Sequence, residues 1–301
     1  MFGVYFGNYL CEKGRLSKEQ AVGLIEEMKG TRLKLGTIAV AEGIMTVKQA
    51  EEVNAIQARE DRRFGDIAIS LGYMTEKDLS LVLSKQGDPY LLYLEILQKH
   101  DIVKQEEMTD LLADFRKSSG FTNYEMEALK SGDIDRIVPI FTQGTDIPVE
   151  IKDYIALAAR NIVRFIDNNV RFGYIKKVSE LKVEKLSYQA IKGDYIFEAA
   201  LGASGDDSGM RKAASVYGRE EFEKVDEDAL DALCEFINVS NGLYARDEGE
   251  YDIVIDMEPP MMKCGDISIS LEEGFYIIPF YISESRVDLI LSKGSELKIE
   301  G

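Results

Sequence analysis

Apolar residues recur at helical spacing between Val225 and Ala245, and this pattern predicts an amphipathic helix. Asp226 is a good N-cap, and Glu227 and Asp228 place negative charge in the first turn, where it is favourable. At about 100° per residue, one face collects the side chains that we expect to be buried. These are Leu230, Leu233, Cys234, Ile237 and Tyr244.

A polar row runs beside that apolar face, at spacings of four, three and four residues: Asp231, Glu235, Asn238 and Gly242. A helical Gly costs about 1 kcal/mol of propensity, and Asn is also a poor interior helix residue. The row therefore suits the close approach of a partner, and we expect chemistry there. The alternative is an ordinary solvated face.

The pattern around this helix predicts an α+β fold for the C-terminal half. Ile151 to Val170 has helical periodicity, Leu186 to Ile191 and Tyr195 to Leu201 form a predicted hairpin, and a helix is expected near Met210 to Tyr217. Four strand candidates follow: Tyr251 to Met257, Ile267 to Leu271, Phe275 to Ile282 and Arg286 to Ser292. Together they predict an antiparallel sheet of about six strands with helices packed on one side.

The first 122 residues contain a repeat of 29 residues. Glycine recurs in two columns at this period, Gly7, Gly36 and Gly65, then Gly14, Gly43 and Gly72, and a fourth copy has lost its glycines. The third copy predicts a helix from Gly65 to Leu71, a Gly turn, a Thr75 cap and a helix from Glu76 to Gln86. A period of this length predicts an all-α stack of helical hairpins.

These patterns divide the chain into three parts. Residues 1–122 form the helical repeat domain, 123–148 a helical connector and 149–301 the α+β domain. The best domain boundary is the Gly144 to Pro148 stretch.

The order Asp231, Glu235, Asn238, followed by Pro259 and Pro260, resembles the signature of the CheC/CheX family of chemotaxis phosphatases. Gly242 stands where the family's helix also carries glycine, and Pro260 lies one residue closer to Asn238 than in the family's pattern. The resemblance covers about Ile151 to Ser292. It implies the same antiparallel sheet architecture that the periodicity predicts.

This resemblance implies hydrolysis of the aspartyl phosphate of a CheY-like response regulator. Glu235 would engage the regulator's Lys, and the Asn238 amide would orient water for in-line attack, with Asp231 and Gly242 in the docking surface. No cofactor of the chain's own is expected, because the divalent metal would belong to the partner. Homodimers occur in the family, but no local feature of this sequence requires one.

The third repeat copy, Arg63 to Gln86, resembles the N-terminal motif of MshE/GspE-type secretion and pilus ATPases, and in the MshE subgroup two such motifs bind cyclic di-GMP. The candidate binding residues are Lys34, Gly36, Arg63 and Gly65. Lys34 replaces the arginine of the binding motif, and a Lys is a point charge rather than a bidentate fork. The alternative is a helical scaffold that binds a protein or nothing.

Composition narrows the functional classes. A net charge of −18, with no basic run to offset it, argues against nucleic-acid binding. Cys11, Cys234 and Cys264 are widely spaced, so we expect reduced thiols in a cytoplasmic protein, and His100 alone cannot anchor a metal cluster. No apolar run is long enough to span a membrane.

Three hypotheses remain open at this stage. The first is an aspartyl-phosphate phosphatase whose helical half regulates or localises it, and the second is a non-catalytic module that docks a response regulator. The third is a cyclic di-GMP effector. Intact Glu235 and Asn238 favour the phosphatase, since a decoy has no evident need of both.

Overall fold

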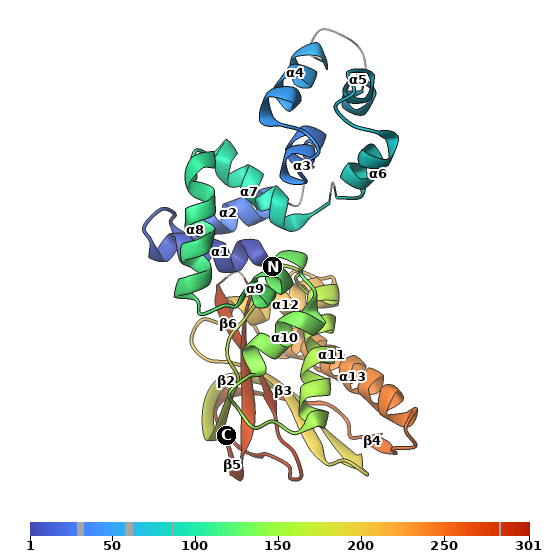
Figure 1. Cartoon of the computed structure of the whole chain (residues 1–301). Coiled ribbons are helices and arrows are strands. Elements are labelled where there is room, and N and C mark those ends of the chain that lie inside the picture. The colour runs from blue at the N-terminus through green and yellow to red at the C-terminus, as the bar shows by residue number, and fades with distance from the viewer. Residues whose placement is uncertain (29–32, 58–62, 86, 283) are drawn as a thin grey trace. The chain divides into compact units, whose positions relative to one another are not determined.

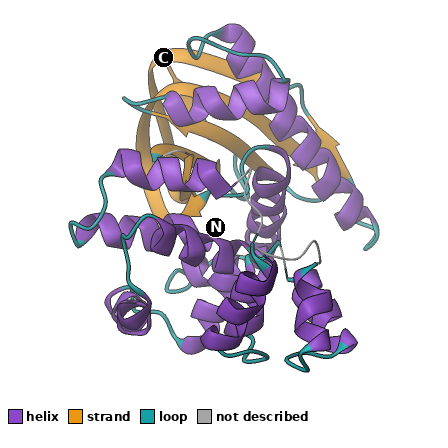
Figure 2. Cartoon of the chain, turned by 90° about the horizontal axis from the view of Figure 1, so that it is seen from above, coloured by secondary structure: helices purple, strands orange, loops and turns teal. Residues whose placement is uncertain are grey.

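The computed structural model describes residues 1–28, 33–57, 63–85, 87–282 and 284–301. The chain separates into two compact units, Phe2–Ser131 and Gly132–Gly301, and Met1 belongs to the second (Figure 1). All described strands lie in the second unit, and Figure 2 distinguishes the purple helices from the orange strands. Among the described residues, no helix is both long and apolar enough to cross a bilayer.

The first unit is entirely helical in its described part. Its helices are α1 (Phe2–Glu12), α2 (Lys18–Met28), α3 (Leu35–Ala41), α4 (Val47–Gln57), α5 (Phe64–Ser70), α6 (Glu76–Ser84), α7 (Pro89–Lys99), α8 (Gln105–Ser118) and α9 (Asn123–Ser131). Aromatic rings of α1 and α8 form part of its core, where Phe6 lies 5.3 Å from Phe115 between ring centroids. Such contacts bury large apolar surfaces in specific geometry.

The two glycine columns of the 29-residue period occupy different structural positions. Gly14, Gly43 and Gly72 end helical hairpin turns with φ of 70°, 68° and 72°, a conformation that favours glycine. Asp101 takes the same place in the fourth copy, with φ of 54°. The aspartate explains how that copy keeps the turn without the glycine, because Asp tolerates this region better than most residues.

Close packing accounts for the other glycine column. A Cβ would lie 2.7 Å from the Tyr93 hydroxyl at Gly7, 3.1 Å from the Phe64 ring at Gly36 and 2.6 Å from Leu79 at Gly65. The glycines therefore let a neighbouring side chain approach the helix backbone.

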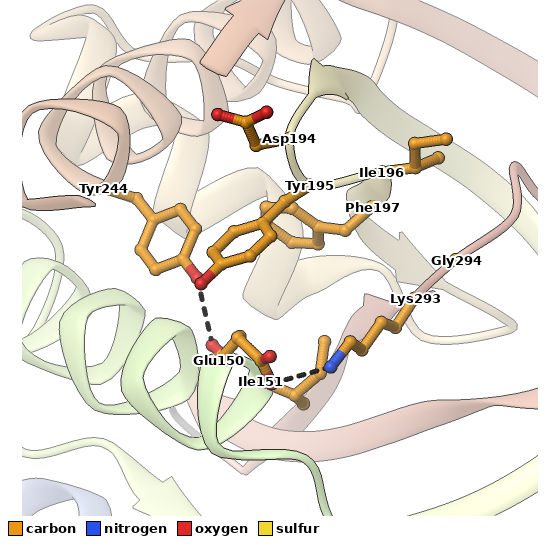
Figure 3. Close-up of a pocket in the computed structure, with 9 residues that line it drawn as sticks. All are labelled: Glu150, Ile151, Asp194, Tyr195, Ile196, Phe197, Tyr244, Lys293 and Gly294. Carbon is orange, nitrogen blue, oxygen red and sulfur yellow. Dashed lines mark hydrogen bonds and ion pairs between the residues drawn. The ribbon is translucent and has the colours of Figure 1, made fainter. Parts of the chain in front are cut away.

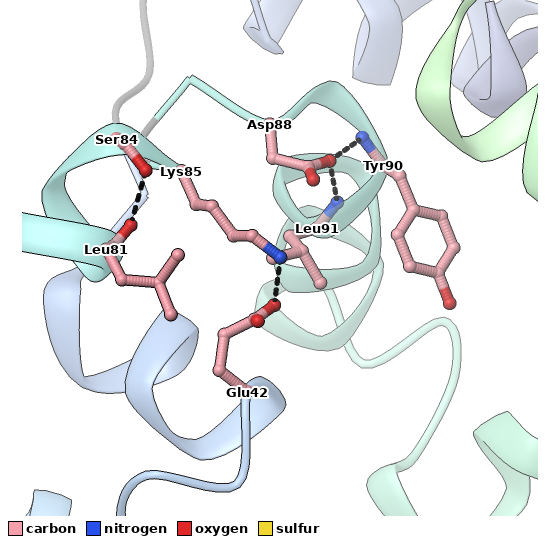
Figure 4. A network of polar contacts seen from close by, with 7 residues as sticks. All are labelled: Glu42, Leu81, Ser84, Lys85, Asp88, Tyr90 and Leu91. Carbon is pink, nitrogen blue, oxygen red and sulfur yellow. Dashed lines mark hydrogen bonds and ion pairs between the residues drawn. The ribbon is translucent and has the colours of Figure 1, made fainter. Parts of the chain in front are cut away.

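The helix ends of the third copy agree with the expected caps. Thr75 and Asp78 form a capping box at the start of α6, and α5 covers the expected first helix to within one residue at each end. The expected end of the second helix, Gln86, lies outside the described residues. Figure 4 shows the following junction, where Lys85 pairs with Glu42 at 2.7 Å and Asp88 accepts from the Tyr90 and Leu91 amides.

The second unit is built on an antiparallel sheet. Its strands are β1 (Arg171–Phe172), β2 (Lys176–Gly193), β3 (Phe197–Ala203), β4 (Ile255–Met257), β5 (Met261–Ile282), β6 (Ser285–Leu291) and β7 (Lys298–Glu300). The path runs β1-β5-β6-β3-β2-β4, β7 pairs with β5, and β2 also pairs with β5. The pairings β5–β6–β3–β2–β5 thus return to their starting strand. The predicted hairpin is confirmed, with Leu186 opposite Gly202.

Two predictions about this unit were wrong in detail. Ile267 to Leu271 and Phe275 to Ile282 belong to one strand, β5, because the chain pairs with β2 on both sides of Gly274, where φ is 81° and the register shifts. The strand expected from Tyr251 is only β4, since a turn with Asp252 at φ of 63° precedes it. Helix α10 (Ile134–Thr142) lies within residues 123–148, for which a helical connector was predicted.

Alternate residues of β2 contact a helix and an apolar cluster. Ser187 and Gln189 face helix α13 (Glu227–Gly249), as their hydrogen bonds to Leu230 and Asn238 show. The intervening Leu186 and Tyr188 belong to a cluster with Ile267, Phe275 and Ile290. This alternation is the normal period of a strand, and it places the polar side chains of β2 under α13. The remaining helices are α11 (Val149–Phe165) and α12 (Ser208–Gly218).

Candidate functional site

Helix α13 begins where its sequence predicts. The Asp226 carboxylate accepts from the Ala229 amide at 3.3 Å, and acidic residues occupy the first turn. Every side chain of the predicted apolar face is buried, namely Leu230, Leu233, Cys234, Ile237 and Tyr244. The apolar face of the helix therefore packs on the sheet. This packing determines which flank of the helix faces solvent.

The polar row of α13 lies along that flank. Asp231 and Glu235 are exposed, and Asn238 and Gly242 are partly exposed. Neither carboxylate accepts a hydrogen bond or forms an ion pair within the described part of the chain. Glu235 and Asn238 are three residues apart and so are neighbours on the helix surface. The row thus presents a charged acceptor beside an amide, both open to a partner.

Asn238 differs from the carboxylates because the sheet beneath it holds its side chain. Gln189 Nε2 of β2 donates to Asn238 Oδ1 at 2.9 Å. Gln189 is 1% exposed, and Asn241, one turn along α13, donates from Nδ2 to Gln189 Oε1 at 2.8 Å. The sequence did not point to Gln189 or Asn241. The available signal was the single amide side chain in the predicted strand Leu186 to Ile191.

Apolar side chains border the polar row. Val239, Met257 and Met261 are 36%, 42% and 54% exposed. A Cβ at Gly242 would lie 3.8 Å from Met257 Cε, and the Cys234 thiol donates to the Met261 carbonyl at 3.3 Å. These three residues, called the apolar rim below, offer adaptable contact area, since methionine repacks easily. The chain itself would admit a Cβ at Gly242, so the glycine is not required by internal packing.

Cys234 is unsuited to be a nucleophile although it precedes Glu235. Burial raises the pKa of its thiol, and the negative charges of Asp231 and Glu235 raise it further against the opposing Ser187 hydrogen bond. Thiolate is the reactive form of cysteine, so this thiol is inert near neutral pH. In the described part of the chain, no group of three or more His, Cys, Asp or Glu side chains could hold a metal ion.

A separate cavity of about 230 Å³ lies near the other end of α13 (Figure 3). Tyr195, Phe197 and Tyr244 contribute aromatic walls, and Lys293 pairs with Glu150 at 2.7 Å. None of the four polar-row residues, Asp231, Glu235, Asn238 and Gly242, lines this cavity. The predicted site and the cavity are therefore different features of the same unit.

One hollow of the helical unit is lined by two of the four candidate cyclic di-GMP residues. Lys34 and Gly36 line a hollow of about 400 Å³ in the helical unit, whereas Arg63 and Gly65 do not. Two carboxylates, Glu51 and Glu95, share that hollow with Lys34. Partial burial raises the pKa of Glu95, and a partly buried acid beside a single lysine is a poor match for a phosphodiester. Cyclic di-GMP binding stays a prediction.

No family model matches the sequence, and no curated protein matches it. Several solved chemotaxis proteins match about half of the chain. CheX from Desulfovibrio desulfuricans has a TM-score of 0.40 and 13% identity, over 48% of this chain and 98% of its own. A CheC-like superfamily protein from Shewanella sp. PV-4 has a TM-score of 0.41 and 13% identity, over 52% and 100%.

CheX from Borrelia burgdorferi, solved in a complex with CheY, BeF3 and Mg²⁺, has a TM-score of 0.39 and 14% identity. It covers 50% of this chain and 98% of its own. All three TM-scores lie below 0.5, so the function proposed below rests on the residues of α13.

Proposed function

We propose that this protein is a phosphatase for the aspartyl phosphate of a CheY-like response regulator. One observation carries the proposal: a capped, anchored helix presents an exposed, unpaired Glu235 beside an Asn238 that the sheet holds in place. The order of the row, Asp231, Glu235, Asn238 and Gly242, is the one that resembles the CheC/CheX signature.

The arrangement fits the chemistry of phosphoryl transfer, which needs mostly positioning and charge stabilisation. Asn238 orients a water whose oxygen attacks phosphorus. The bond between phosphorus and the regulator's aspartyl oxygen breaks, its electron pair stays on the released carboxylate, and the water proton leaves with phosphate or solvent. Glu235 engages a lysine of the regulator and aligns the two proteins. The divalent ion belongs to the partner.

The apolar rim supports docking of a folded partner on this face. Val239, Met257 and Met261 are exposed beside the polar row, so they add apolar contact area next to the two reactive positions. A partner that covered the rim would exclude water from Glu235 and Asn238, which strengthens their electrostatic interactions.

The test is the decay of a phosphorylated CheY-type regulator with the wild-type protein, Asn238→Ala and Glu235→Ala. We expect Asn238→Ala to slow decay at saturation about 100-fold while sparing docking, because it removes the water-orienting group but little contact area. Glu235→Ala should weaken both docking and hydrolysis. Asp231→Ala, farther along the row, is the matched control and should have a smaller effect.

Two outcomes would contradict the proposal in different ways. Unchanged hydrolysis by Asn238→Ala would remove the site assignment. Binding of the regulator without faster decay, by wild type and variants alike, would instead identify a docking module.

A further inference from the structure

Three polar side chains connect the interior of the second unit to Asn238. The Tyr154 hydroxyl of α11 donates to Asn241 Oδ1 at 2.6 Å, and Asn241 Nδ2 donates to Gln189 Oε1 at 2.8 Å. Gln189 Nε2 then donates to Asn238 Oδ1 at 2.9 Å. Tyr154, Asn241 and Gln189 are 2%, 0% and 1% exposed. A buried chain of this kind is stable only when each member is satisfied.

One backbone carbonyl fixes the direction of the whole chain. Gln189 Nε2 also donates to the Glu258 carbonyl oxygen at 2.6 Å. A backbone carbonyl can only accept, so the NH₂ group of Gln189 must face Glu258, and its second hydrogen goes to Asn238. The oxygen of Gln189 then faces Asn241, and because this oxygen can only accept, the NH₂ group of Asn241 must donate to it. The orientation of three amides thus follows from a single unambiguous acceptor.

The consequence for Asn238 is that its oxygen faces the sheet and its nitrogen does not. Asn238 Nδ2 has no hydrogen-bond partner in the described part of the chain, and it is absent from the buried unpaired atoms found there. It therefore reaches solvent on the partly exposed flank of α13. Both of its hydrogens are available to a ligand.

We propose that Gln189 is a positioning residue that holds Asn238 as a hydrogen-bond donor toward the bound regulator. This inference rests on the proposed function and defines the role of Asn238 within it. An Nδ2 hydrogen binds one lone pair of the attacking water, and the second lone pair faces phosphorus. If Asn238 turned over, the group nearest the water and the phosphoryl oxygens would be a carbonyl oxygen, which attracts no electron pair and repels developing negative charge.

Side-chain NMR of the full chain tests the orientation without any activity. The Asn238 NH₂ signal is assigned by its loss in Asn238→Ala. In wild type we expect its hydrogens to exchange rapidly with water, while those of Gln189 and Asn241 are protected. In Gln189→Glu, a carboxylate can only accept when ionised, so Asn238 should turn its NH₂ inward and become protected.

The wild-type measurement decides first, because it does not depend on the folding of any variant. An Asn238 NH₂ group as protected as that of Gln189 would overturn the positioning role, whether or not the protein dephosphorylates a regulator. Failure of the wild type to accelerate decay would overturn the proposed function, while the exchange data would still report how Gln189 holds Asn238.

Kinetics with a phosphorylated CheY-type receiver test the consequence. Gln189→Met keeps the side-chain length but removes both hydrogen-bonding groups. We expect the saturating rate to fall about tenfold or more, because the water-holding group is no longer oriented. The half-saturating concentration should change less than about threefold, since the docking surface is intact.

Asn161→Ala is the matched control for lost stability. Asn161 of α11 donates from Nδ2 to the Ser240 hydroxyl of α13 at 3.1 Å, and both side chains are buried. This variant breaks a buried amide contact between the same two helices without touching Gln189 or Asn238. A normal saturating rate for Asn161→Ala and a low one for Gln189→Met support the proposal. A normal rate for Gln189→Met, or equal losses in both variants, overturn it.

Discussion

At the scale of single residues, Glu198 of β3 makes stability depend on pH. The side chain is 3% exposed, and burial raises its pKa to about 7, opposed by the Leu297 amide, which donates to Oε2 at 2.8 Å. Glu296 and Glu258 raise the pKa further by repulsion. Because the folded state binds this proton more tightly than the unfolded state, stability is lost as pH rises from the ordinary carboxyl pKa to about 7.

The corresponding prediction concerns Glu198→Gln, which keeps an oxygen for the Leu297 amide but cannot ionise. Between about pH 5 and 7 the free energy of unfolding of the wild type should fall relative to the variant by about 1.4 kcal/mol per pH unit, and the difference should level off above this range. Urea unfolding of both proteins at several pH values measures it. The two proteins share all other titrating groups. Parallel pH profiles would therefore show that Glu198 ionises as readily in the folded protein as in the unfolded chain, and would contradict the prediction.

The sequence identifies Asn238 as a candidate site residue but does not identify Gln189, the residue that holds it. Asn238 was identifiable because it interrupts an exposed helix flank at a spacing that resembles a known signature. Gln189 was not, because its partners come from α13 and from the backbone at Glu258, which are 49 and 69 residues away. A buried amide requires hydrogen-bond partners, but the sequence does not identify them. Only the position of β2 under α13 shows which groups they are.

At the scale of elements, helix α13 was predictable and strand β5 was not. The cap, the first-turn charges and the buried face of α13 are all local properties, and each is present. Glu272, Glu273 and Gly274 resemble a turn between two strands in sequence. In the structure β5 continues through them because it pairs with β2 on both sides of this point, from Ile277 to Met261. Long-range pairing therefore overrode a local turn signal.

The apolar rim beside α13 gives a prediction at the same scale. Met257→Ser removes a 42% exposed side chain next to Gly242 without touching Glu235 or Asn238. We expect the half-saturating concentration for a phosphorylated regulator to rise about fivefold, from the loss of roughly 1 kcal/mol of apolar contact. The saturating rate should stay unchanged. Val149→Ser, a 65% exposed apolar position at the start of α11, is the control and should alter neither quantity.

At the scale of the whole molecule, charge is the dominant feature. The sequence has 54 acidic and 36 basic residues, which gives the net charge of −18. Several acidic side chains are paired with a lysine or arginine. Most of these ion pairs are exposed and contribute little to the stability of the fold. Such an excess of one sign destabilises a compact state through self-repulsion, and salt screens that repulsion over about 10 Å at 0.1 M.

We therefore expect the thermal midpoint to rise by several degrees between about 10 mM and 300 mM NaCl, because screening relieves net repulsion more than it weakens exposed ion pairs. Glu220→Lys with Glu223→Lys changes two exposed residues outside the proposed site and moves the net charge from −18 to −14. The variant should start from a higher midpoint at low salt and gain less from added salt. A midpoint that falls with salt in the wild type would show that specific ion pairs, not net repulsion, control the stability of this acidic chain.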